Sequence, residues 1–139
     1  MYLKEIDYSL RNETLIHKLT IIWQKSVEAT HLFLSPQDIK DILPQVVIGL
    51  KQIPILLVSF TDDDEPIGFA GIADNKLEML FLSPDYFQQG IGYKMISTAI
   101  QDCQIKYVDV NEQNPKALKF YLRQDFTIFK RSPVDSDNR

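Results

Sequence analysis

The stretch of residues 80–92, LFLSPDYFQQGIG, decides the fold that this sequence predicts. An apolar strand ends there, a loop that contains Pro84 follows, and a Gly-x-Gly turn opens a helix at Tyr93. Two glycines around one aliphatic residue leave backbone N–H groups uncovered at the start of that helix. These donors and the positive end of the helix dipole can together hold a phosphate or pyrophosphate. Gly-x-Gly before a helix is also common as a simple tight turn, so this interpretation needs a second element.

The second element is the stretch of residues 110–126, VNEQNPKALKFYLRQDF. Together the two segments resemble the acetyl-CoA site of the GCN5-related N-acetyltransferase (GNAT) superfamily. The first resembles the family's Q/R-x-x-G-x-G/A loop, and the second its N-x-x-A-x-x-F-Y-x-x-x-G-F segment. The ATHLFL run of residues 29–34 and residues 110–114 resemble the small bacterial acetyltransferases of the YjaB type, and the likeness covers nearly the whole chain. The matching positions of the second segment are Asn114, Ala117, Phe120, Tyr121 and Phe126.

The chain departs from the family pattern at two positions. Phe87 stands where the loop has Gln or Arg, so a polar side chain is missing there, although Gln88 and Gln89 are adjacent. Asp125 stands where the second segment has Gly, and Asp tolerates a left-handed backbone better than most residues. The first departure therefore bears on cofactor affinity, and neither departure argues against the fold.

Length and composition predict a single domain over residues 1–139. A chain of 139 residues with 45% hydrophobic content can bury one sizeable core but hardly two. The net charge is −4 and there is no long basic run, which argues against a nucleic-acid partner. The acidic residues 62–65 could mark a cation site, but their place between two apolar strands favours a solvated hairpin turn.

The same features predict a cytoplasmic protein. Cys103 is the only cysteine, which excludes an internal disulfide and suits a reducing compartment. The first five residues lack the apolar core of a signal peptide. The longest apolar run, residues 53–60, is far too short to span a bilayer, so no membrane association is expected.

Hydrophobic periodicity predicts elements in the order β-α-α-β-β-β-α-β-α-β. Pro44 lies inside the second helix and should kink or split it near Leu43. The predicted fold class is α/β of the α+β type. The resemblance implies the GNAT fold, with a mixed, mostly antiparallel, twisted sheet flanked by about four helices. The predicted elements cover residues 2–7, 12–29, 35 to about 47, 55–60, 67–73, 77–82, 93–103, 106–110, 115–123 and 126–130.

The final strand of the GNAT fold is missing from this prediction. The resemblance implies a seventh strand between the strand at 126–130 and the strand at 106–110. Residues 132–138 are polar, contain Pro133 and are rich in turn formers, so they do not predict a strand. Three explanations stay open: a truncated sequence, a strand supplied by another chain, or an inward shift of the last strand to pair with 106–110.

Other functional classes fit the residues less well. Gly90, Gly92 and Asp109 match a dinucleotide-binding fingerprint, but Met95 stands at the third glycine and no second βαβ half follows. No Gly-Lys-Ser/Thr or Gly-x-Ser-x-Gly motif is present, which argues against a P-loop and a serine hydrolase. With two histidines and one cysteine in no paired spacing, we expect no metal site. Cys103 lies on the apolar face of a helix and is expected to be a core residue.

The resemblance implies an acetyl-CoA-dependent N-acetyltransferase that moves an acetyl group to a primary amine of a small molecule or peptide by direct attack. In such a fold pantetheine inserts between two splayed parallel strands, here 77–82 and 106–110. Backbone amides near Leu80 and Leu82 would hold pantetheine. The pyrophosphate would be held at the glycine loop, by Gln88, Gln89, Gly90, Ile91, Gly92 and Tyr93. Asn114 is either a helix cap alone or also a cofactor contact.

The resemblance also implies catalytic roles. Tyr121 matches the residue whose hydroxyl faces the cofactor sulfur and acts as general acid; the alternative is that it only packs under the sheet. Glu78 is expected on the same strand face as Leu80 and Leu82, where it could relay a proton through water. His31, in the link between the first two helices, is either a second candidate base or a structural hydrogen-bonding group.

The acceptor site is less defined by the sequence. Trp23, Glu28, His31 and Phe33 either shape an acceptor pocket or are simply core and surface residues. A monomer and a homodimer both fit. A non-catalytic acetyl-CoA or CoA sensor of the same fold is the alternative function, and the loss of the polar side chain at Phe87 is the reason to keep it.

Overall fold

The computed structural model describes residues 1–30, 34–105, 107–111 and 127–132, and in them the chain forms one sheet with helices on both faces. The strand order is β1-β2-β3-β4-β5-β6. The first four strands are antiparallel, whereas β4–β5 and β5–β6 are parallel. In chain order the elements are β1 Tyr2–Glu5, η1 Tyr8–Leu10, α1 Glu13–Thr30, α2 Pro36–Gln52, β2 Ile55–Phe60, β3 Pro66–Ala73, β4 Lys76–Leu82, η2 Pro84–Tyr86, α3 Ile91–Cys103, β5 Tyr107–Asn111 and β6 Thr127–Ser132.

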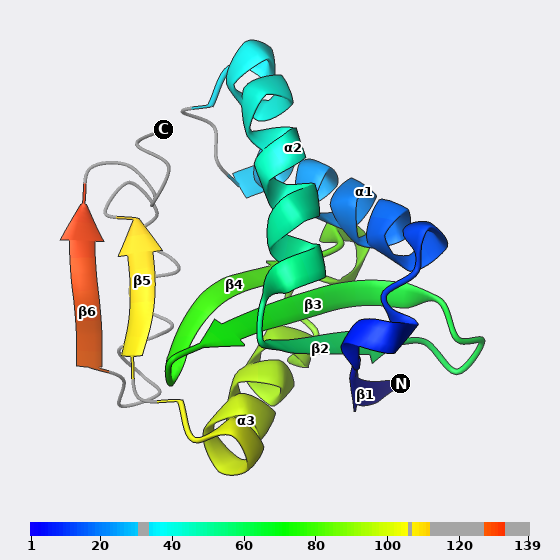
Figure 1. Cartoon of the computed structure of the whole chain (residues 1–139), viewed down its shortest axis with the longest axis vertical. Coiled ribbons are helices and arrows are strands. Elements are labelled where there is room, and N and C mark those ends of the chain that lie inside the picture. The colour runs from blue at the N-terminus through cyan, green and yellow to red at the C-terminus, as the bar shows by residue number, and fades with distance from the viewer. Residues whose placement is uncertain (31–33, 106, 112–126, 133–139) are drawn as a thin grey trace.

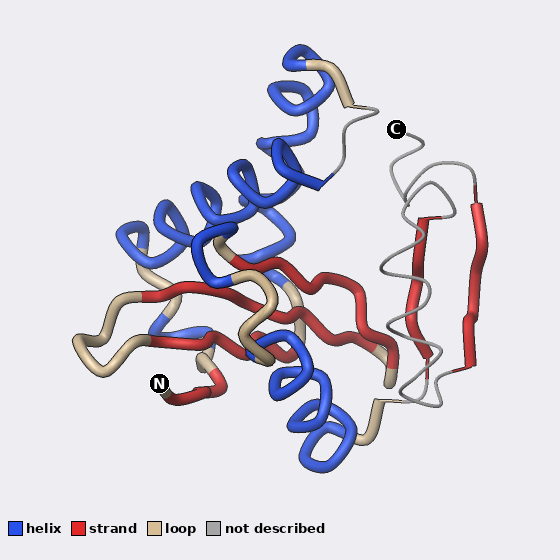
Figure 2. The backbone as a smooth tube through the Cα atoms, turned by 180° about the vertical axis from the view of Figure 1, so that it is seen from behind, coloured by secondary structure: helices blue, strands red, loops and turns tan. Residues whose placement is uncertain are grey.

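Helices α1 and α2 cover one face of the sheet, and α3 covers the other (Figures 1 and 2). Strands β2 and β3 are buried over most of their length because helices pack on both of their faces. The core beneath α1 and α2 is built around Leu19, Trp23, Leu50, Val58 and Phe69. The core beneath α3 contains Ile72, Leu77, Met95, Ile96 and Ala99.

The second helix begins as predicted but does not break. Ser35 and Asp38 form a capping box with both hydrogen bonds at 3.1 Å, and Pro36 occupies the first turn. Pro44 removes a backbone donor, yet α2 remains one helix to Gln52, so the expected split near Leu43 is wrong, and the alternative of a kink there stays a prediction. Packing outweighs the lost hydrogen bond because the helix buries residues on both sides of Pro44, namely Ile39, Ile42, Val46 and Leu50.

The ends of the chain show how the sheet is completed. Strand β1 ends at Glu5 instead of Asp7, because Asp7 is the N-cap residue of η1. Strand β6 pairs in parallel with β5, beginning at Tyr107↔Thr127. This is the inward pairing that was one of the three expectations for the last strand. The helix predicted for residues 115–123 lies outside the described residues.

One side chain that the sequence did not single out joins the amino-terminal segment to the end of α2. The guanidinium of Arg11 donates to the carbonyl oxygens of Ile6 (3.1 Å), Leu50 (3.2 Å) and Ile53 (2.7 Å). A fourth contact reaches the Lys51 carbonyl at 3.3 Å. The last carbonyls of a helix have no intrahelical partners and carry partial negative charge. Arg11 therefore supplies donors to a carbonyl between β1 and η1 and to the carbonyls at the end of α2.

Arg11→Met should lower the free energy of unfolding by about 1–3 kcal/mol, because partly buried carbonyls lose a charged donor. Arg11→Lys should recover only part of this loss, because an ammonium lacks the planar set of donors that reaches several carbonyls at once. Urea denaturation followed by circular dichroism measures both changes. Lys4→Met, on exposed β1, is the charge-matched control. Equal stability of the Arg11→Met variant and the natural protein would contradict this role.

Candidate active site

Strands β4 and β5 meet over only two residue pairs, Lys76↔Tyr107 and Leu77↔Val108. Strand β4 continues to Leu82 and stays paired with β3 along this length, whereas β5 continues to Asn111 alongside β6. The two parallel strands therefore diverge beyond their first residues, as Figures 1 and 2 show. Within the described part of the chain, no strand pairs with this edge of β4 over residues 78–82, and we call it the open β4 edge.

The open β4 edge presents backbone donors and acceptors at alternate residues. Ser83 donates its N–H to the Ile67 carbonyl at 2.8 Å. In an antiparallel pair, residues that bond the partner strand alternate with residues that point away from it. Counting back from Ser83, Phe81 bonds β3 and the N–H and C=O groups of Leu80 and Leu82 point away from β3. This is the orientation that the predicted role of these two amides requires.

A β-bulge in β4 changes the position of Glu78. Met79 pairs with Gly71 and Leu77 pairs with Ile72, so Glu78 is the extra residue between two consecutive pairs. Leu77, Leu80 and Leu82 all pack against the α3 core, which a regular alternation of side chains does not allow. Glu78 instead forms an ion pair with Lys76, on the opposite face from Leu77. The expectation that Glu78 shares a face with Leu80 and Leu82 is therefore wrong.

The glycine loop has the backbone geometry of an anion seat. Gly90 is the N-cap of α3 with φ +80°, a left-handed conformation that glycine adopts without strain. The first helical hydrogen bond runs from Lys94 N–H to Gly90 C=O at 3.1 Å, and no side chain caps the helix. The N–H groups of Ile91, Gly92 and Tyr93 thus lack intrahelical acceptors. The helix begins two residues earlier than predicted, which brings Ile91 into this set.

The space in front of these donors is open. A Cβ atom added at Gly90 or Gly92 would meet no atom within 4 Å. Gln88 and Gln89 are exposed beside the seat, and the Gln89 amide donates to the Asp85 carbonyl at 3.3 Å. An uncovered helix start with aligned N–H groups fits a phosphate or pyrophosphate group. Phe87, at the first position of the loop, is half-buried and adds no polar group to the seat.

Only two of the predicted acceptor residues, Trp23 and Glu28, lie within the described part of the chain. Trp23 is only 4% exposed and lies in the core beneath α1 and α2, which is the packing alternative for this residue. Glu28 is exposed near the end of α1. Four predicted site residues lie outside the described residues, namely His31, Phe33, Asn114 and Tyr121.

Cys103 occupies a core position at the end of α3. Its side chain packs, half-buried, against the α3 core. Burial raises the pKa of the Cys103 thiol above its ordinary value, which disfavours the reactive thiolate. This agrees with the prediction of a core cysteine.

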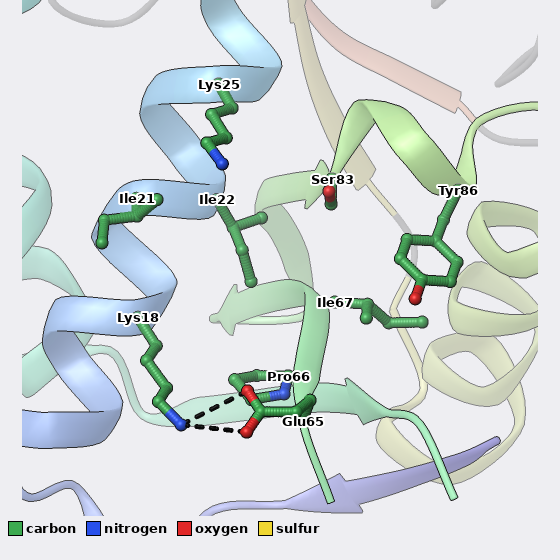
Figure 3. Close-up of a pocket in the computed structure, with 9 residues that line it drawn as sticks. All are labelled: Lys18, Ile21, Ile22, Lys25, Glu65, Pro66, Ile67, Ser83 and Tyr86. Carbon is green, nitrogen blue, oxygen red and sulfur yellow. Dashed lines mark hydrogen bonds and ion pairs between the residues drawn. The ribbon is translucent and has the colours of Figure 1, made fainter. Parts of the chain in front are cut away.

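A hollow of about 300 Å³ lies between α1, the start of β3 and η2 (Figure 3). At one end the Lys18 ammonium is 3.3 Å from both carboxylate oxygens of Glu65. None of the predicted site residues that the structure describes lines this hollow. Its polar residues Ser83 and Tyr86 belong to the segment that leads into the glycine loop.

Two other features are absent from the described residues. No group of three or more His, Cys, Asp or Glu side chains there could hold a metal ion. None of the described helices is long and apolar enough to cross a membrane.

Residues 46–137 match the family model described as the acetyltransferase (GNAT) domain. The chain belongs to the GNAT superfamily. Among its curated relatives, the peptidyl-lysine N-acetyltransferase YjaB of Salmonella typhimurium is 39% identical over 118 residues, which are 85% of this chain and 81% of the relative. The YjaB of Escherichia coli is 34% identical over 118 residues, 85% of this chain and 80% of the relative.

Solved structures agree with this assignment. The solution structure of apo YjaB from Escherichia coli matches with a TM-score of 0.78 and 29% identity, over 98% of this chain and 90% of that one. The crystal structure of PaiA N-acetyltransferase from Thermoplasma acidophilum in complex with coenzyme A has the same fold, with a TM-score of 0.68 and 20% identity over 89% of each chain. The predicted family, the likeness to the YjaB type and the mixed fold are confirmed, and this GNAT protein is an acyltransferase enzyme.

Gly92→Glu and Gly92→Gln form a matched pair that tests the anion seat. An acidic residue in the first turn of a helix favours folding, but it opposes a bound pyrophosphate. We expect both variants to keep the stability of the natural protein to within about 1 kcal/mol. The Glu variant should bind coenzyme A at least about tenfold more weakly than the Gln variant, as measured by calorimetry.

The same pair of changes at Gly49 is the control, because that position in α2 is equally open. Coenzyme A affinity should not differ between Gly49→Glu and Gly49→Gln. Equal affinity of the two Gly92 variants would show that no anion binds at the start of α3.

Proposed function

We propose that this acyltransferase uses acetyl-CoA to acetylate the ε-amine of a lysine in a peptide or protein. The observation that carries the proposal is the open β4 edge lying between diverging strands, with the uncapped start of α3 directly after it in the chain. The two curated relatives, which span most of this chain, are named peptidyl-lysine N-acetyltransferases. A lysine side chain also satisfies the broader expectation of a primary amine on a peptide.

The cofactor would be held mainly by backbone groups. The N–H and C=O groups of Leu80 and Leu82 would bind pantetheine as an added strand partner, and the N–H groups from Ile91 to Tyr93 would bind the pyrophosphate. Bound acetyl-CoA supplies the thioester that the amine attacks. The crystal structure of PaiA, which has the same fold, contains coenzyme A and supports a CoA site in this fold.

Two proton transfers remain for side chains. A lysine ammonium has an ordinary pKa of about 10.4, so at neutral pH a base must remove its proton before attack. We assign this role to the Glu78 carboxylate, acting directly or through one water, with His31 as the other candidate. The Tyr121 hydroxyl is assigned to protonate the departing thiolate of CoA, as the resemblance implies.

A sensor that binds acetyl-CoA without turnover is the second candidate. The half-buried Phe87 favours it, because the first position of the loop contributes no polar contact to the cofactor. A thiol-release assay separates the two functions. Release of free CoA with a lysine-containing peptide, but not with the same peptide carrying Arg in place of Lys, is expected for the enzyme. Tight acetyl-CoA binding with no release for any lysine peptide would favour the sensor.

Tyr121→Phe should lower kcat by about 10²–10⁴-fold, because the variant lacks only a proton donor. Its affinity for acetyl-CoA should remain within about twofold of the natural protein, because backbone groups supply most of the proposed binding. Single-turnover kinetics and calorimetry measure these two quantities. Tyr86→Phe, which removes a hydroxyl from the hollow between α1 and η2, is the matched control. An unchanged rate in the Tyr121 variant would reassign this residue to packing.

A further inference from the structure

An ion pair lies at the point where β4 and β5 part. The Lys76 ammonium is 3.1 Å from Oε1 of Glu78, and the two side chains are 20% and 36% exposed. Lys76 is the first residue of β4, where it pairs with Ala73 of β3 and with Tyr107 of β5. The more buried partner of the ion pair is therefore anchored in the middle of the sheet, at the base of the divergence.

The bulge directs this pair to one face of the sheet. Leu77 packs against the α3 core, and neighbouring residues of an extended strand point to opposite faces. Lys76 and Glu78 thus lie on the face that carries α1 and α2, where Met79 and Phe81 also pack. Without the bulge, Glu78 would point toward α3 with Leu80.

The chemistry of the pair matches that of the proposed acceptor. The substrate of a lysine acetyltransferase is a primary alkyl ammonium that must give up a proton. Lys76 is the same chemical group, already within hydrogen-bond distance of the carboxylate to which we assign that proton. A second ammonium that approaches Glu78 meets the like charge of Lys76. An ion pair with this much exposure contributes little, so an incoming ammonium can replace it.

We propose that Lys76 is an intramolecular competitor of the acceptor: its ammonium occupies the place at Glu78 that the substrate lysine must take. This inference rests on the proposed function and adds a residue that sets the apparent affinity for the acceptor. Each acceptor binding event includes displacement of Lys76 from Glu78. The acceptor KM is therefore higher than it would be if Glu78 had no ion-pair partner. Acetyl-CoA binding involves neither charge and is independent of the pair.

The test is the steady-state kinetics of a lysine-containing peptide at saturating acetyl-CoA. Lys76→Met should lower the acceptor KM about two- to fivefold and leave the KM for acetyl-CoA unchanged. Lys76→Gln is a second neutral variant, to be used if the Met variant is unstable. Lys76→Arg keeps the charge and should keep the acceptor KM. Lys4→Met changes net charge equally at the far edge of the sheet and should change neither KM.

Coupling between the two residues provides the second readout. In a Glu78→Gln background, Lys76→Met should no longer change the affinity for the peptide. Calorimetric titration of the peptide into the CoA-bound protein measures this affinity without turnover. An acceptor affinity that is unchanged or weaker in Lys76→Met, with Glu78 intact, would overturn the inference while leaving the proposed function standing. Absence of CoA release from the natural protein with every lysine peptide would instead contradict the proposed function.

Discussion

The pairing of β4 with β5 over two residue pairs is the constraint on which the rest of the site depends. Two pairs are enough to fix the parallel orientation and the starting register of the strands, and too few to hold them together along their length. Strand β4 remains bonded to β3, and β5 remains bonded to β6, so each strand keeps one complete ladder. Between the two strands, unpaired backbone thus lies on the open β4 edge and on the facing edge of β5 over residues 109–111, where a ligand can complete it.

Most of the proposed cofactor recognition uses backbone groups, so it does not depend on a polar side chain at Phe87. The amides of Leu80 and Leu82 are oriented by the alternation of the β3–β4 ladder. The donors that follow Gly90 are oriented by the first turn of α3. The replacement of the family's Gln or Arg by Phe87 removes none of these backbone groups. Side chains are needed chiefly for proton transfer, and Glu78, to which we assign one of the two transfers, is the extra residue at the bulge of β4.

The sequence predicted what depends on local periodicity. The amphipathic spacing in α1, the Ser35 cap of α2 and the glycine before α3 each act within a few residues, and each of these helices begins within two residues of its predicted start. The family was predicted from two motifs taken together, the glycine loop in residues 80–92 and the segment from Asn114 to Phe126. Neither motif alone identifies the family.

The features that the sequence did not predict depend on partners that are distant along the chain. The face of Glu78 depends on a bulge, and a bulge is defined only by the register of β3 against β4. Arg11 contacts carbonyls of α2 about forty residues away, and no motif marks such a contact. Burial of the apolar face on both sides of Pro44 keeps α2 continuous. This is an effect of tertiary packing, which helix propensity alone does not predict.

The most direct test of this account is amide hydrogen exchange of the full chain, followed residue by residue by NMR with and without coenzyme A. In the free protein, the N–H groups of Leu80 and Leu82 should exchange faster than that of Phe81, which is bonded to β3. Coenzyme A should slow the exchange of Leu80, Leu82 and the first-turn amides of α3, and leave Phe81 nearly unchanged. Slow exchange at Leu80 and Leu82 in the free protein, or no protection at these amides when coenzyme A is bound, would contradict the claim that the divergence of β4 and β5 forms the cofactor site.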